Sequence, residues 1–202
     1  PASIQDSFLG EEWVPPLLED SARFQAAGKL HPLGLEPEHG EMAWVEPDNL
    51  DFGFPALHEL VVNLHALAFE LNLKDPKLGL RRAFQGSTML LRLTEGCRVP
   101  VRLDSVAGGA ETGHKISAVY FIGRKGGGDA DKSQQASSEE GDAINAGGQL
   151  RLKNMETNAP LAEGIPTADR LVMFRSDCVS TQTLEVLGHE REQYAMLFWM
   201  HG

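Results

Sequence analysis

The stretch VPVRLDSVAGGAETGHKISAVYFIG, from Val99 to Gly123, indicates the fold most clearly. Its two ends are rich in Val, Ile and Tyr, and the glycine-containing middle separates them, which is typical of two short strands joined by a loose loop. The first strand carries Arg102, Leu103 and Asp104. No helical pattern follows the glycines, so the loop does not have the form of a nucleotide-binding turn.

Similar strand signals fill the second part of the chain. After residue 82, short β-rich runs alternate with Gly, Pro, Asp and Asn turns. We predict strands within 87–96, 99–105, 114–123, 147–154, 169–177, 181–188 and 193–200. Seven or eight strands of this kind indicate a sandwich or a barrel.

The first part of the chain is predicted to be mainly helical. Pro15 and Pro16 suit the first turn of a helix over 14–27, and apolar residues at i, i+3, i+4 and i+7 predict a longer helix over 55–73. A short strand is expected in the segment HGEMAWVEPDN, residues 39–49. Helices followed by strands predict an α+β fold.

Composition limits the classes of function. The chain has 202 residues with a net charge of -11, and it has no basic stripe, which argues against nucleic-acid binding. No apolar run is long enough to span a bilayer, although peripheral association remains open. Cys97 and Cys178 are too few for a structural zinc site, but one disulfide is left open. A start at Pro1 would suit a processed mitochondrial or plastid protein; without processing, a cytoplasmic location is expected.

A polar insert interrupts the strands. Residues 124–148, RKGGGDADKSQQASSEEGDAINAGG, lack the apolar residues needed for a core of their own. We therefore expect this insert to be held by something outside itself, with a neighbouring protein subunit as one candidate.

The order of these segments resembles the prolyl 4-hydroxylase branch of the Fe(II)- and 2-oxoglutarate-dependent dioxygenases, specifically the oxygen-sensing type. The resemblance covers nearly the whole chain and implies a double-stranded β-helix, or jelly roll, with N-terminal support helices. It implies one domain over 1–202, with helical support over about 1–82 and a jelly roll over about 83–202. The matching segments are HGEMAWVE, PALHELVVNLHALAFELN, STMLLRLTEGCRVPVRLD, HKISAVYFIG, GGQLRL, ADRLVMFRSD and QYAMLFWM.

The resemblance also implies an iron site, which the family builds from two histidines and one carboxylate. Arg102 stands at the first histidine position and Asp104 at the carboxylate position, and the second histidine corresponds to Thr181 or Gln182. A guanidinium is always protonated and has no lone pair to donate, and neither Thr nor Gln replaces an imidazole. We therefore predict a vestigial metal site without a catalytic residue, in which Arg102 and Asp104 form an ion pair.

The implied 2-oxoglutarate contacts are altered as well. The carboxylate-binding arginine corresponds to Gln193, whose amide cannot form a bidentate charge-assisted pair. Arg191 lies two residues earlier, about 7 Å along a strand. The supporting tyrosine corresponds to Phe121, which lacks the hydroxyl. No cofactor is therefore predicted, and Fe(II) with 2-oxoglutarate is expected only if displaced residues replace the missing ligands.

Other titratable side chains have ordinary interpretations. His114 is expected in a loop near a strand, with a replacement metal ligand as the alternative, and His189 and His201 are expected in solvent. His58 and His65 are seven residues apart on the longer predicted helix, about 10 Å, which is too far for one metal and indicates packing. Cys178 is interpreted as a buried thiol, with a reactive thiol as the alternative.

Three functions are consistent with this pattern. The first is a non-catalytic dioxygenase-fold protein that acts as a structural or interaction subunit of a larger, organellar assembly, with the 124–148 insert as a contact to other subunits. The second is a divergent hydroxylase that uses Asp104, a displaced histidine such as His114 or His189, and Arg191. The third is a metal-free module that binds a peptide or a small anion through Arg102.

Overall fold

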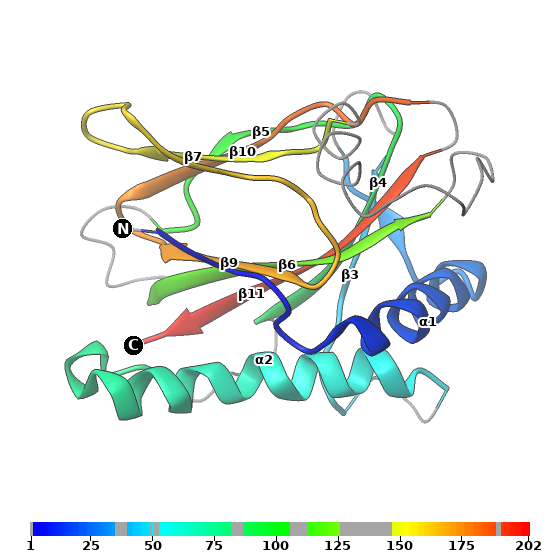
Figure 1. Cartoon of the computed structure of the whole chain (residues 1–202), viewed down its shortest axis with the longest axis horizontal. Coiled ribbons are helices and arrows are strands. Elements are labelled where there is room, and N and C mark those ends of the chain that lie inside the picture. Colours follow the sequence, from blue (N-terminus) through cyan, green and yellow to red (C-terminus); the bar gives the residue numbers. More distant parts are fainter. Residues whose placement is uncertain are drawn as a thin grey trace.

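The computed structural model describes residues 2–34, 40–48, 50, 53–81, 87–105, 113–125, 147–188 and 191–202. These residues form two antiparallel sheets that face each other, with two helices on the outer side of the larger sheet (Figure 1). The predicted α+β jelly roll is therefore confirmed.

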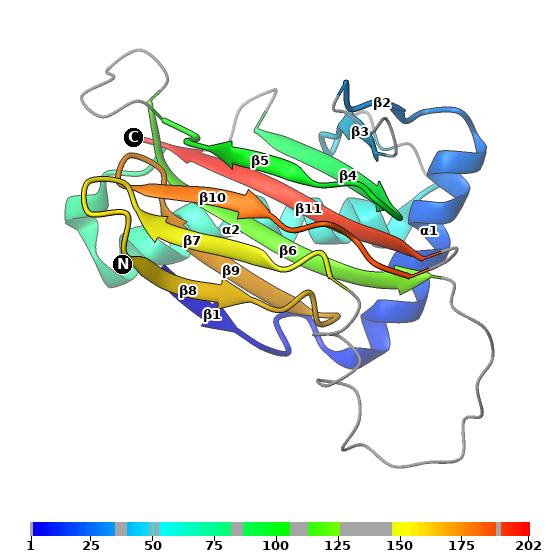
Figure 2. The same ribbon diagram turned by 90° about the horizontal axis from the view of Figure 1, so that it is seen from above.

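The larger sheet is assembled from both halves of the chain. Its order is β1 (Ala2–Gln5), β9 (Arg170–Arg175), β6 (His114–Lys125), β11 (Glu192–His201), β4 (Thr88–Thr94), β3 (Gly40–Trp44) and β2 (His31–Pro32). The smaller sheet has the order β5 (Val99–Arg102), β10 (Val179–Thr183), β7 (Leu150–Asn154) and β8 (Pro160–Gly164). Figure 2 shows the smaller sheet lying over the larger one.

Strand β11, at the centre of the larger sheet, contributes to both hydrophobic cores, one beneath the helices and one between the two sheets. Its residues from Gln193 to Met200 are all buried, because each face of this central strand meets a different core. Alternate side chains enter the two cores, as expected for a period of two. Tyr194, Met196, Phe198 and Met200 belong to the core beneath the helices, and Ala195, Leu197 and Trp199 to the core between the sheets.

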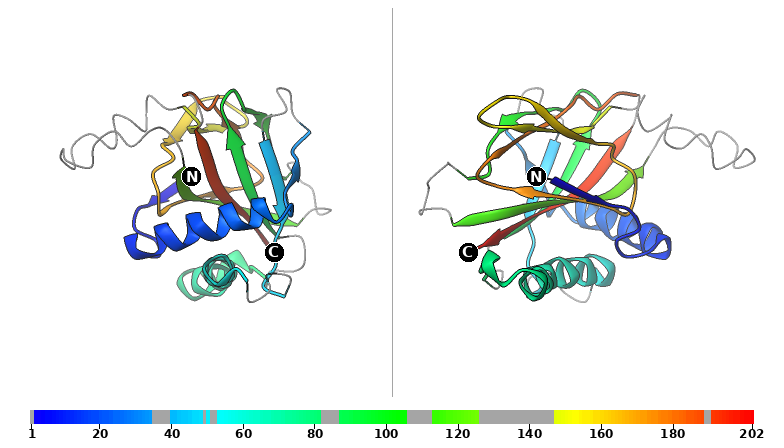
Figure 3. Two further views of the ribbon diagram at one scale, coloured as in Figure 1. Left: turned by 90° about the vertical axis from the view of Figure 1, so that its right-hand side faces the viewer. Right: turned by 60° about the vertical axis from the view of Figure 1, so that its left-hand side comes forward.

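The two predicted helices are confirmed. Helix α1 (Val14–Ala26) begins with two prolines in its first turn, and α2 (Pro55–Lys74) is the longer helix. Both lie on one side of the larger sheet (Figure 3), where the predicted apolar stripe of α2 is buried against the sheet. Two short 3-10 helices, η1 (Glu11–Trp13) and η2 (Pro76–Leu78), lie next to the N-terminus of α1 and the C-terminus of α2. Among the described residues, no helix combines the length and the apolar character needed to cross a membrane.

Three strands differ from the sequence-based expectation. The first part of the chain supplies β1 and β2 in addition to the predicted β3, so it is more than a helical support. Strand β8 was not anticipated either. All three are short, β1 and β8 expose most of their residues, and β2 and β8 contain proline, so they lack the apolar alternation that identifies a strand in sequence.

Most of the insert, residues 126–146, lies outside the described part of the chain. Its described base is closed by hydrogen bonds. The guanidinium of Arg124 donates to the carbonyl of Gly147 at 2.6 Å, and the amide of Gly148 donates to the carbonyl of Glu185 at 2.9 Å. The prediction that a partner holds the insert stays a prediction.

Candidate functional site

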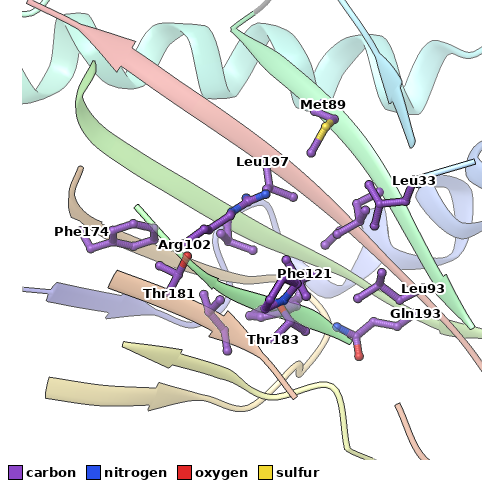
Figure 4. Close-up of a pocket in the computed structure, with 16 residues that line it drawn as sticks. Leu33, Met89, Leu93, Arg102, Phe121, Phe174, Thr181, Thr183, Gln193 and Leu197 are labelled. Carbon is purple, nitrogen blue, oxygen red and sulfur yellow. The ribbon is translucent and has the colours of Figure 1, made fainter. Parts of the chain in front are cut away.

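A pocket of about 210 Å³ lies between the two sheets, at the position that the sequence singled out. It is mostly apolar, because the inward-facing side chains of β4, β6 and β11 form one wall and those of β5 and β10 the other (Figure 4). Its lining residues are Leu33, Met89, Leu91, Leu93, Val99, Pro100, Arg102, Val119, Phe121, Leu150, Phe174, Thr181, Thr183, Gln193, Ala195 and Leu197.

Arg102 supplies the only formal charge among these lining residues. It ends β5, and its side chain is 36% exposed, with Nε 3.4 Å from Oδ1 of Asp104. The Asp104 side chain is only 7% exposed, so the guanidinium is the cation that accompanies a nearly buried carboxylate. The predicted ion pair is confirmed.

The register of β5 and β10 shows which of Thr181 and Gln182 lies on the same face of the sheet as Arg102. Thr181 is the direct cross-strand partner of Arg102, and paired residues point to the same face of a sheet. Thr181 is buried and lines the pocket beside Arg102 (Figure 4), whereas Gln182 belongs to the opposite face of β10. Thr181 is therefore the residue opposite Arg102, and sequence alone did not separate the two.

Gln193 and Phe121 also line the pocket, and each residue is only 2% exposed. Nε2 of Gln193 donates to the carbonyl of Gly148 at 3.3 Å, while Oε1 is buried without a hydrogen-bond partner in the described part of the chain. Gly148 has φ +71, and a side chain there would meet Oε1 of Gln193 at 2.2 Å. The base of the insert therefore packs directly against the Gln193 end of the pocket.

Among the polar residues at the pocket, the sequence did not single out Thr183, nor Gly148, which contacts Gln193. Thr183 lies two positions after Thr181, so the period of two in β10 placed it on the same face. Gly148 contacts Gln193 although the two are 45 residues apart, and no local pattern announces that contact.

The displaced residues of the hydroxylase alternative lie elsewhere. Arg191 does not line the pocket. It lies near Arg124 at the base of the insert, where burial of Arg124 and, to a smaller extent, the charge of Arg191 lower the pKa of Arg124. Nδ1 of His114 lies 3.0 Å from the main-chain oxygen of Asp104, and the His114 ring contacts Trp199 and His201 instead of the pocket. His189 lies outside the described residues.

The residues that line the pocket do not fit the iron that the resemblance to the dioxygenases implies. Iron(II) in such sites is bound by imidazole and carboxylate groups. None of the sixteen lining residues is His, Cys, Asp or Glu, and the described residues contain no group of three such side chains able to hold a metal. A guanidinium beside the carboxylate adds a positive charge that opposes a divalent cation.

The remaining candidates have structural surroundings. Nε2 of His65 lies 2.8 Å from Oγ1 of Thr88, and its ring stacks on Phe198, which confirms a packing role for His65. Cys97 and Cys178 are free, so the disulfide left open by the sequence is not formed. Burial raises the pKa of both thiols, which disfavours the reactive thiolate.

Comparison with known proteins identifies the fold. No protein-family model and no curated protein matches the sequence. A prolyl-4-hydroxylase from Pseudomonas putida has a TM-score of 0.71 and 22% identity, covering 99% of this chain and 91% of that one. A prolyl hydroxylase from Trichoplax adhaerens, solved with a hypoxia inducible factor peptide fragment, has a TM-score of 0.73 and 17% identity, covering 99% and 83%.

A prolyl 4-hydroxylase structure from Phytophthora capsici gives a TM-score of 0.67 at 19% identity, over 100% of this chain and 58% of that one. The TM-scores establish a shared fold, and identities this low carry no function across. The chain has the prolyl 4-hydroxylase-like fold of the 2-oxoglutarate- and Fe(II)-dependent oxygenases.

Proposed function

We propose that this chain is a non-catalytic protein of the dioxygenase fold that serves as a structural or interaction subunit of a larger assembly. The observation that carries the proposal is the Arg102–Asp104 ion pair, at the positions that correspond to a histidine and a carboxylate in the family. Because Arg102 has no lone pair to donate and keeps its charge at every physiological pH, it is the least suitable side chain for a metal position.

The neighbouring changes support the same conclusion. Thr181, Gln193 and Phe121 line the same pocket, and the resemblance sets them at the positions of an imidazole, a carboxylate-binding arginine and a tyrosine. The apolar framework around them is complete. Because the core is kept while these side chains do not suit iron or 2-oxoglutarate, we expect the protein to function through contacts of its surface and not through oxidation.

Turnover of 2-oxoglutarate tests the non-catalytic part. The full chain is incubated with Fe(II), ascorbate and 2-oxoglutarate, and succinate is measured, because dioxygenases release succinate even in slow uncoupled turnover. We expect the same succinate as with Arg102→Ala and with no protein. Succinate above that background in the wild type, lost in Asp104→Ala, would contradict the proposal.

Native size tests the subunit part. The tagged chain, purified from its own cells under stringent washing, is expected to elute in an assembly of other polypeptides, with organelle fractions as the first place to look. Elution of the chain by itself from cells at native expression level would contradict a subunit role.

One observation favours a second function, the binding of a small carboxylate in the same pocket. The side chain of Arg102 is 36% exposed and contacts Asp104 through Nε, and Oε1 of Gln193 is a buried acceptor without a donor in the described part of the chain. A ligand with a carboxylate at one end and an O–H or N–H at the other would satisfy both groups.

Calorimetry with 4-hydroxybutyrate and butyrate tests this second function. Both should bind the wild type, 4-hydroxybutyrate more tightly, and Arg102→Gln should weaken both by roughly tenfold or more. Equal affinity of Arg102→Gln and wild type, or no binding to either, would reject the pocket as an anion site.

A further inference from the structure

Helix α2 has a second apolar face, opposite the one that packs on the sheet. Val62, Phe69 and Leu73 are 40%, 68% and 69% exposed, and Ala66 is exposed between them. At 100° per residue these four side chains fall within about 60° of one another. The face that they form is called the outer stripe below.

The outer stripe is not what a surface helix normally presents. Such a helix carries polar residues on the side away from the core. Figures 1 and 3 show α2 as the outermost layer, with no described element on its far side. An aligned row of exposed apolar side chains, two of them more than two-thirds exposed, marks an interaction surface.

The spacing of the outer stripe identifies the occupant. Its members are separated by four, three and four residues, which is the seam spacing of paired helices and reads the same in both directions. We propose that a second copy of this chain packs its own α2 antiparallel against the outer stripe, around a two-fold axis. Val62 then faces Leu73 of the second copy, and Ala66 faces Phe69 of the second copy.

Side-chain size supports the antiparallel direction. Pairing small Ala66 with large Phe69 fits a knob into a hole, twice by symmetry, whereas a parallel pair would place Phe69 against Phe69 and Ala66 against Ala66. A hollow of about 430 Å³ beside the stripe, with Ala66, Phe69 and Leu80 on its walls, provides room for the incoming ring.

Charge along one flank supports the same direction. In an antiparallel pair each flank meets the same flank of its copy. Glu59, at the start of α2, then lies opposite Lys74 of the second copy, at the end of its α2, and the pair occurs twice. Glu70 faces Asn63 of the second copy, so no like charges oppose each other. Within the described residues Lys74 and Glu70 have no ion-pair partner.

Sedimentation velocity on the full chain over a range of concentrations tests the dimer. The wild type should form a dimer, and Phe69→Glu should raise its dissociation constant by at least roughly 30-fold. Leu161→Glu, which changes a 41% exposed leucine of β8, is the matched control and should not alter the constant. A wild type that stays monomeric at every concentration, or a Phe69→Glu dimer of unchanged strength, would overturn the proposal.

Cysteine pairing tests the direction. In a Cys178→Ser background, a mixture of Val62→Cys and Leu73→Cys chains should form a disulfide dimer on oxidation. Neither variant alone should, because the like residues lie about 16 Å apart along the antiparallel helices. Disulfides within either single variant would indicate a parallel pair, and trapping of a different protein would assign α2 to that partner; each outcome overturns the proposal. The result is independent of metal binding, so it can fail while the non-catalytic function stands, and the reverse.

Discussion

Arg102 and Thr181 are cross-strand partners on β5 and β10. The distance between paired side chains therefore decides whether histidines at these two positions could bind one metal. Directly paired residues place their Cβ atoms about 5 Å apart, which allows two histidines to share one metal. Asp104 is close to the same point through its contact with Arg102. Histidines at positions 102 and 181 would therefore lie near each other and near Asp104.

The double variant Arg102→His, Thr181→His is expected to bind Co(II) with saturable one-to-one stoichiometry, because it places two imidazoles beside Asp104. The visible absorption of Co(II) measures both binding and coordination geometry. Arg102→His alone, with one imidazole and Asp104, should bind much more weakly. A double variant that folds and gives no Co(II) spectrum would show that these positions do not converge on one point.

His65 should give the protein a specific dependence on pH. Burial lowers the pKa of His65 in the folded protein, although the nearby charge of Glu46 partly opposes this. Below about pH 6.5 the unfolded chain then binds more protons than the folded one. The free energy of unfolding should fall as the pH drops from 7 through this range.

Urea unfolding of the wild type and of His65→Gln at several pH values isolates this contribution. The stability of the wild type relative to His65→Gln should shrink as the pH falls, since glutamine does not titrate. A constant difference between the two proteins would show that His65 has the same pKa folded and unfolded.

At the scale of elements, α1 and α2 are joined through Asp20. Helix α2 has no side-chain cap of its own, and the carboxylate of Asp20 on α1 accepts from the amides of Ala56 and Leu57 at 2.7 and 3.2 Å. The Asp20 side chain is nearly buried and also pairs with Arg23. A carboxylate at a helix N-terminus accepts hydrogen bonds from first-turn amides that have no acceptor within the helix, and its negative charge interacts favourably with the helix dipole.

Asp20→Ala should lower the free energy of unfolding by about 2 kcal/mol, because it leaves the first amides of α2 without an acceptor. Asp20→Asn should cost less, since it keeps a carbonyl oxygen. Glu19→Ala, next to Asp20 but exposed, is the control and should change stability by less than about 0.5 kcal/mol. Equal effects at positions 19 and 20, measured by urea unfolding, would contradict the capping role.

The elements with the strongest sequence signal, α2 and β11, have long apolar patterns. The stripe of α2 buries one face of the helix, and the apolar run of β11 buries both faces of the strand, so the pattern determines the element. Strands β1, β2 and β8 have two to five residues and are mostly exposed, and the pairing with their neighbours forms them. Tertiary pairing of that kind leaves no local signal.

At the scale of the whole molecule, distant segments meet around the jelly roll. Asp169 accepts hydrogen bonds from the amides of Leu9 and Gly10, each at 2.8 Å, and from the hydroxyl of Tyr120 at 2.9 Å. This buried carboxylate ties the N-terminal segment to β6 and to the turn before β9. Such contacts span up to 160 residues and could not be predicted from sequence.

The candidate site was predictable only in part from the sequence. The Arg102–Asp104 ion pair followed from charge and proximity in sequence, whereas the vestigial character of the site stays a prediction. The choice of Thr181 over Gln182, and the contact between Gly148 and Gln193, required strand register and the closure of the insert. Register depends on the partner strand, which a sequence pattern alone does not specify.

The central claim, that this dioxygenase fold does not hold a catalytic metal, is tested most directly by calorimetric titration of the full wild-type chain. Fe(II) under nitrogen and Mn(II) in air are each titrated with and without 2-oxoglutarate, with the Arg102→His, Thr181→His variant alongside. We expect no saturable binding to the wild type under any of these conditions. Stoichiometric binding of either metal to the wild type, lost in Asp104→Ala, would contradict the claim.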